Sequence, residues 1–421
     1  MNRHRQSWRG VLFGAALMVL VPAIGGVSVA FAQSEAPKPN TIRPEIATPL
    51  KAAEELMAAK KFPEALAKLR EADGVADRTP YENYVIDRTR GIAAANAGDM
   101  PASLKSFEAV VASGFAPPGE QVKLVEALAR TYFRMADYPK ATLWASRYLK
   151  DGGTDPQMRL LRVRSLYLSG EFAPAATELR SLVDADEKKG VPTALEQLQL
   201  LGSCYTKLND NAGYVFVLEK LLAYYPKKEY WADAIRRVET KPGFAESLGL
   251  DVLRLQEVTG NLGSVEQYSL MTQLLLKASY PAEAKRVVDQ GFASGVLGTG
   301  PDADLHQRLR DTAAKQTLED EKMLAQNAKD ASAAKDGNPM VIVGYALVSS
   351  GQFDKGLALM EQGIQKGVAI RPEEAKLHLA IAYLAAGQKA KAIVAFRAVQ
   401  GADGTADLAR LWLIHAQRSS S

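Results

Sequence analysis

The 421-residue chain has a single cysteine, Cys204, and only four histidines. One cysteine excludes an intramolecular disulfide, so the fold depends on apolar packing. His306, His378 and His415 stand far apart, and none has a neighbouring His or Cys at the spacing of metal ligands. The fourth histidine, His4, lies near the N-terminus. We therefore predict no metal site, and we expect the histidines to lie at the surface or between packed helices.

The chain also lacks the short motifs that carry nucleotide or acyl-transfer chemistry. It has no Gly-rich phosphate loop, because Gly298-Thr299-Gly300 runs into Pro301, which is typical of a turn before a helix. It has no Gly-x-Ser-x-Gly sequence. The lone Cys204 falls inside an expected helix, which favours a buried, unreactive thiol. We therefore predict that the protein is not an enzyme, has no catalytic residue and uses no cofactor.

The chain also has no large excess of positive over negative charge. The net charge of the whole chain is +4, but Arg3, Arg5 and Arg9 supply three of these charges within the first 32 residues, which hold no acidic residue. Without that segment the net charge falls to +1. This balance gives no reason to expect binding to nucleic acid, which requires a strongly basic surface.

The first 32 residues have the pattern of a secretory signal peptide. After the arginines, an apolar run covers residues 11–23, and a small-residue cleavage pattern ends at Ala32. Residues 11–32 carry no charge, so an uncleaved membrane anchor is the alternative, but proline and glycine within them favour cleavage. We expect export to the periplasm, with residues 33–45 as a disordered linker rich in proline and polar side chains.

An internal repeat is the main signal in the rest of the chain. A small or polar residue is followed by one polar residue, an aromatic, two further residues and then alanine or another small residue. Copies of this pattern end at residues 65, 141 and 175, and weaker copies end at 103 and 214. Later copies end at 284, 356 and 392, the last with Lys389 in place of the aromatic. Most copies are 34 to 39 residues apart, and two steps are about twice as long. We therefore expect two degenerate units, around residues 230–260 and 302–335.

Each unit has the periodicity of two helices. Apolar residues recur at helical spacing before the pattern, and proline often occupies the first turn of the helix after it, where its missing N–H costs nothing. The unit resembles the tetratricopeptide repeat (TPR) family, which places a small residue at its eighth position and a large one at its eleventh. The eighth positions here hold Gly91, Ala129, Gly202, Gly344 and Ala380, and the eleventh hold Tyr132, Leu166, Tyr205, Leu347 and Tyr383.

The resemblance implies an all-α fold, a right-handed α-solenoid of about ten TPR-like helix-turn-helix repeats, whose function is binding. We expect an N-terminal solenoid over residues 46–297 and C-terminal repeats over 338–421, ending in a capping helix over 406–417. Residues 298–337 are poor in large apolar side chains. They are expected to form a degenerate repeat or hinge, with an exposed second helix from Leu318 to Ala334.

The resemblance also implies a binding groove, because first helices line the concave face of this family. Arginine pairs with carboxylates, and aromatic rings add rigid contact area, so such a groove suits an extended or acidic peptide. In the alternative, the arginine stems cover the helix faces and their charged ends stay in water. The family's Lys and Asn carboxylate clamp is not matched. The positions that correspond to the groove include Arg88, Lys123, Arg130, Phe133, Arg134, Arg164 and Tyr167.

A narrower resemblance concerns two segments, ELMAAKKFPEALAKL at residues 55–69 and YYPKKEYW at residues 224–231. Both are similar to periplasmic TPR proteins that accompany TonB-type energy-transduction systems of Gram-negative bacteria. This resemblance implies a scaffold or adaptor whose partner belongs to the inner-membrane TonB-type components. The alternative is an assembly or export factor for outer-membrane proteins or polysaccharide.

Overall fold

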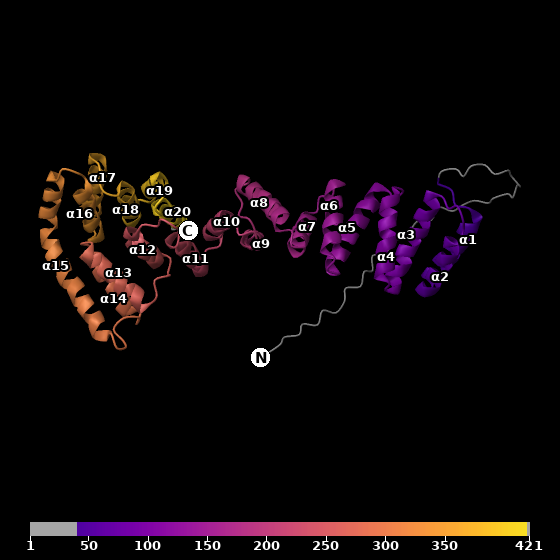
Figure 1. The fold of residues 1–421 in the computed structure, drawn as a ribbon, viewed down its shortest axis with the longest axis horizontal. Coiled ribbons are helices and arrows are strands. Elements are labelled where there is room, and N and C mark those ends of the chain that lie inside the picture. Colours follow the sequence, from indigo (N-terminus) through magenta and orange to yellow (C-terminus); the bar gives the residue numbers. More distant parts are fainter. Residues whose placement is uncertain (1–39, 419–421) are drawn as a thin grey trace. The chain divides into compact units, whose positions relative to one another are not determined.

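The computed structural model describes residues 40–418, which form twenty α-helices, one short 3₁₀ helix and no β-strand (Figure 1). The helices follow one another as packed hairpins, so the predicted all-α repeat fold is confirmed. The predicted signal peptide and residues 33–39 of the predicted linker lie outside the described residues. The linker prediction is wrong at its end, because residues 44 and 45 already belong to the first helix. No helix in the described range has the length and apolar character that crossing a bilayer requires.

The described residues divide into two compact units, 40–128 and 129–418, with the boundary inside α5 (Pro118–Arg134). In the first unit Glu82, which has no exposed surface, connects two hairpins. It accepts hydrogen bonds from Arg43 and from the backbone N–H of Thr79, which caps α3. The other helices of this unit are α1 (Pro44–Ala58), α2 (Phe62–Asp73), α3 (Pro80–Ala97) and α4 (Met100–Ser113).

The second unit contains the remaining helices. They are α6 (Tyr138–Lys150), α7 (Pro156–Leu168), α8 (Phe172–Lys188), α9 (Leu195–Lys207), α10 (Asn211–Tyr224), α11 (Lys228–Glu239), the 3₁₀ helix η1 (Glu246–Leu248), α12 (Gly249–Val258), α13 (Val265–Lys277), α14 (Pro281–Ala293), α15 (Ala303–Ala333), α16 (Asn338–Ser349), α17 (Phe353–Lys366), α18 (Pro372–Ala385), α19 (Lys389–Ala398) and α20 (Thr405–Arg418).

The recurring sequence pattern marks the turn inside each hairpin. In all eight copies, the residue two positions before the second helix has a positive φ, the left-handed conformation that commonly ends a helix. Half of these residues are glycine, which adopts that conformation without steric cost. They are Lys60, Gly98, Ala136, Gly170, Asn209, Ser279, Gly351 and Gly387.

The small and large residues of the repeat pack as the resemblance implied. Gly91 is buried so tightly that a Cβ atom there would lie 2.6 Å from a ring carbon of Phe107. Gly344 and Gly356 let α16 and α17 approach until their backbones touch. The large residues lie in the core, apart from Tyr205, which is half-buried.

Residues 303–333 depart from the prediction. The expected second helix from Leu318 does not exist as a separate element, because α15 is one continuous helix of 31 residues. The segment contains neither glycine nor proline, so nothing in it ends the first helix. It packs on α14 and α16, while Leu318 itself points outward and is 61% exposed.

The last helix also makes contacts that the sequence did not predict. Helix α20 packs on α18 and α19, as expected of a terminal helix, and additionally on α10, α11 and α12 (Figure 1). Lys241 Nζ lies 2.7 Å from Asp407 Oδ2, and Arg418 Nη1 donates to the carbonyl oxygen of Ala223 at 2.8 Å. The C-terminal helices therefore fold back onto the middle of the second unit and close its α10–α20 part.

Candidate functional site

The predicted groove residues lie on the first helices of three successive repeats, α3, α5 and α7. The two compact units divide them. Arg88 and Lys123 belong to the first unit. The second unit holds Arg130, Phe133, Arg134, Arg164 and Tyr167, and the site is therefore described there.

Three of the predicted groove arginines form ion pairs that the repeat pattern does not predict. In each case, the partner is an acidic residue at the start of the next repeat's first helix. The helix dipole also stabilises a negative charge at that position. The pairs are Arg88 with Glu120 at 2.8 Å, Arg130 with Asp155 at 2.7 Å, and Arg164 with Glu196 at 2.6 Å. The arginines thus link successive repeats as well as facing solvent.

The two predicted aromatic residues occupy equivalent places. Phe133 packs edge-on against Tyr138, with ring centroids 5.7 Å apart, and Tyr167 packs in the same way against Phe172 at 5.3 Å. In both cases, the second ring begins the following helix. Each predicted aromatic side chain therefore helps to close its own hairpin and is only partly exposed.

Arg164 and Tyr167 also line a shallow cavity of about 330 Å³ between α7 and α9. Leu168, 48% exposed, and Leu200 contribute apolar surface beside the Arg164–Glu196 pair. Glu196 is 73% exposed, so its carboxylate is mostly in water. An apolar depression thus lies next to the Arg164 guanidinium group, whose ion-pair partner Glu196 is exposed.

The other predicted features have ordinary structural environments. Burial raises the pKa of the Cys204 thiol to about 11, which leaves it protonated and unreactive at neutral pH. His306 is buried and accepts a hydrogen bond from the backbone N–H of Gly298. Within residues 40–418, no group of three His, Cys, Asp or Glu side chains has the geometry to hold a metal ion.

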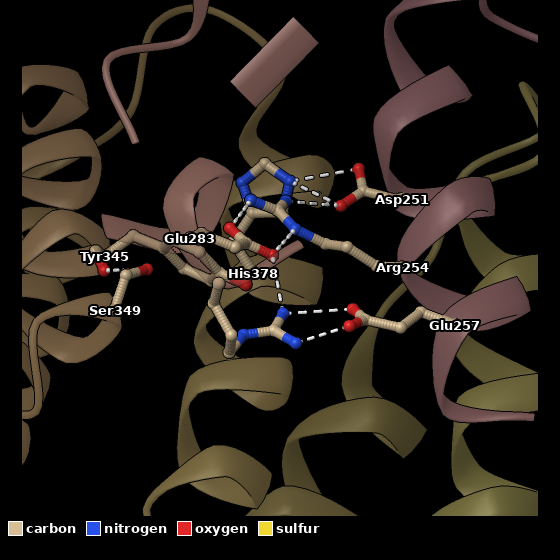
Figure 2. A network of polar contacts seen from close by, with 8 residues as sticks. Asp251, Arg254, Glu257, Glu283, Tyr345, Ser349 and His378 are labelled. Carbon is tan, nitrogen blue, oxygen red and sulfur yellow. Dashed lines mark hydrogen bonds and ion pairs between the residues drawn. The ribbon is translucent and has the colours of Figure 1, made fainter. Parts of the chain in front are cut away.

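A buried charged network, which the sequence patterns do not predict, joins α12, α14 and α18 (Figure 2). Arg254, with a side chain only 3% exposed, donates to Glu283 Oε2 at 2.7 Å and to Asp251 Oδ1 at 3.0 Å. His378 Nε2 lies 3.0 Å from Asp251 Oδ2. At the outer edge of the network, Arg286 Nη2 donates to Glu257 at 3.0 Å.

This network satisfies the condition under which charges survive burial, because each one has an opposite partner. Burial alone would raise the pKa of Asp251, but His378 and Arg254 hold it below its ordinary value. Burial likewise opposes the charge of Arg254, yet Glu283 keeps the pKa of Arg254 well above normal. The Arg254 guanidinium carbon lies 4.5 Å from the centroid of the Tyr345 ring, which adds a cation–π contact.

Comparison with known proteins adds little to this geometry. No family model matches the chain, and no curated protein matches it. Among solved structures, the TPR2AB domain of yeast Sti1 in its pHSP90 complex is 13% identical and covers 71% of this chain and 98% of its own, with a TM-score of 0.24. Yeast Tom70 is 11% identical over 89% of this chain and 96% of its own, with a TM-score of 0.24. The TPR domain of P58(IPK) is 15% identical over 89% and 97%, with a TM-score of 0.21. These scores are too low to transfer a function or a site.

Proposed function

We propose that this protein is a TPR-type scaffold of the bacterial periplasm, which binds a protein partner on α5, α7 and α9 of its second unit. The observation that carries the proposal is the pairing of Arg164 with Glu196 at the edge of an apolar depression. The residues of this depression present a guanidinium group and apolar surface side by side, which is the combination that recognises a peptide segment.

The ion pair is suited to exchange with a partner. Exposed pairs contribute only about 0–1 kcal/mol, so a partner's carboxylate replaces Glu196 at little cost. Arginine binds an incoming carboxylate with two parallel hydrogen bonds. The depression formed by Tyr167, Leu168 and Leu200 then receives an apolar side chain next to that carboxylate. The partner is thus an extended segment in which an acidic and an apolar residue are neighbours.

The location and the partner's identity rest on the sequence. The first 32 residues have the order of a cleaved export signal, which supports the periplasm. Residues 55–69 and 224–231 resemble periplasmic proteins that accompany TonB-type systems, which supports an inner-membrane TonB-type component as the partner. In this role the protein holds components of the energy-transduction complex together and catalyses nothing itself.

Calorimetry on purified components tests this proposal. Residues 33–421 are titrated with the periplasmic segments of the TonB-type components at low and high salt. We expect salt-sensitive binding that is lost when Arg130, Arg134 and Arg164 are all replaced by alanine. A matched control removes three other exposed arginines, Arg147, Arg236 and Arg397, and keeps the affinity. Absence of binding to every component, or equal loss in both triple variants, contradicts the proposal.

A further inference from the structure

A cavity of about 650 Å³ lies where α20 folds back onto α10 and α11. Its volume falls in the range of small-molecule sites, roughly 300–1,000 Å³. Val215 and Phe216 of α10, Val238 of α11 and Leu411 of α20 give it apolar surface. The three helices together therefore form a hollow that can take the apolar part of a ligand.

The charged part of the lining carries an excess of positive charge. It holds three cations and two carboxylates, namely Arg237, Lys241 and Arg410 with Glu219 and Asp407. Arg237 pairs with Asp233, a carboxylate outside the lining that Arg236 also contacts. Counted with these two residues, four cations stand against three carboxylates, so the cluster has a net charge of +1.

Two of these cations keep hydrogen-bond donors that no acidic residue uses. Asp407 is shared between them, because its Oδ2 lies 2.7 Å from Lys241 Nζ and its Oδ1 accepts from Arg410 Nη2 at 2.5 Å. Glu219 Oε1 lies 3.3 Å from Arg410 Nε. Arg410 Nη1 and two N–H groups of the Lys241 ammonium thus have no acceptor among residues 40–418.

These donors are open to a ligand. The Lys241 side chain is 49% exposed and the Arg410 side chain 55% exposed. Both line the cavity, and the carboxylate that they share holds their charged ends together at its edge. A carboxylate that accepts from both cations would gain charge-assisted hydrogen bonds, which are the stronger class.

We propose that this cavity binds a small amphipathic monoanion, a carboxylic acid with an apolar chain. The ligand carboxylate accepts hydrogen bonds from Arg410 Nη1 and Lys241 Nζ, and the chain packs against the apolar side chains of α10, α11 and α20. One negative charge balances the excess of +1, whereas a dianion leaves a negative excess beside Glu219 and Asp407. The site uses other helices than the protein-binding proposal does, so each proposal can fail alone.

Decanoate is the probe for this site. Calorimetric titration of residues 33–421 with decanoate, below its micelle concentration, is expected to give saturable binding at one site. The neutral alcohol 1-decanol has the same chain length and lacks the carboxylate. We expect 1-decanol to bind at least about tenfold more weakly, as for the loss of one charge-assisted hydrogen bond.

Single substitutions test the two cations. Lys241→Gln and Arg410→Gln should each weaken decanoate binding about tenfold. Each variant leaves Asp407 with one cation, so the helical circular dichroism should be retained. Lys285→Gln and Arg147→Gln are the matched controls, since both remove an exposed cation that pairs with one aspartate outside the cavity, and they should leave the affinity unchanged.

A further variant tests the apolar part of the site without changing any charge. Val215→Trp fills the cavity from α10 and is expected to abolish decanoate binding while the protein stays folded. This variant also separates binding in the cavity from attraction to surface cations. The proposal is overturned if decanoate shows no saturable binding, if 1-decanol binds equally well, or if the folded variants bind decanoate as the natural sequence does.

Discussion

His378 on α18 lies 3.0 Å from Asp251 on α12, although 127 residues separate them in the chain. Through Arg254, the same carboxylate is connected to Glu283 on α14. The closure of the second unit therefore depends on a polar network inside an otherwise apolar core. The free energy of unfolding of the second unit should therefore fall strongly when one charged residue of this network is replaced.

Arg254→Met leaves the buried carboxylates of Asp251 and Glu283 without their cation. We predict a loss of about 3–5 kcal/mol in the free energy of unfolding, measured by urea denaturation. Neutralising both acids in the same chain, with Asp251→Asn and Glu283→Gln, should recover much of this loss. Equal stability of the single variant and the natural sequence would show that the network carries no net charge interaction.

Glu82 provides a pH-dependent contribution in the first unit. Hydrogen bonds from Arg43 lower the pKa of Glu82 to about 2, below the ordinary carboxyl value of 4.5. Because the folded pKa is the lower one, this stabilisation is complete above about pH 5 and is lost as the pH falls towards 2. Denaturation between pH 3 and 7 should show a steeper acid loss for the natural sequence than for Glu82→Gln.

Two glycines at the same place in the repeat should behave differently. A Cβ atom at Gly91 would lie 2.6 Å from the Phe107 ring, so Gly91→Ala should destabilise by about 1–3 kcal/mol. At Gly202 the nearest atom, on Val217, is 3.4 Å away, which is ordinary contact. Gly202→Ala should be neutral or stabilising by up to about 1 kcal/mol, because alanine favours helix. Thermal denaturation of both variants makes the comparison, and similar effects would contradict it.

Glu196 competes with the partner for Arg164 in the proposed exchange. We therefore predict that Glu196→Ala raises the affinity for the partner several-fold, whereas Arg164→Ala lowers it. Neither change should alter stability by more than about 1 kcal/mol, since the pair is exposed. Calorimetry with the same partner segment measures both. A lower affinity for Glu196→Ala would mean that the pair shapes the site and is not displaced.

The sequence patterns predict features within one repeat, and they do not predict contacts between segments far apart in the chain. The hairpin turns were visible because residues such as Gly170 and Gly351 adopt a left-handed conformation just before an aromatic helix start. The spacing from these turns also predicts that Gly91 and Ala129 are packed between helices, and both are buried. Helix α15 is continuous because residues 303–333 hold no glycine or proline at the place where the repeat spacing predicts a turn.

The closed part of the second unit was not predictable from the same patterns. No periodicity relates Asp251 to His378, or Lys241 to Asp407, which are 166 residues apart. The one signal in the sequence is Arg254, which stands between Leu253 and Leu255 in an apolar run. An arginine on a buried helix face requires an acidic partner. On the α5–α9 surface, the residues were predicted but their acidic partners were not, since each partner belongs to the next repeat.

Crosslinked affinity purification from detergent-solubilised envelopes tests the scaffold proposal most directly. The tagged protein is compared with its Arg130, Arg134 and Arg164 triple alanine variant, and the partners are identified by mass spectrometry. We predict that TonB-type inner-membrane components are recovered with the natural sequence and lost with the variant, whose helical circular dichroism is unchanged. Recovery of outer-membrane assembly or polysaccharide-export components instead, or of the same components with both proteins, would contradict the proposal.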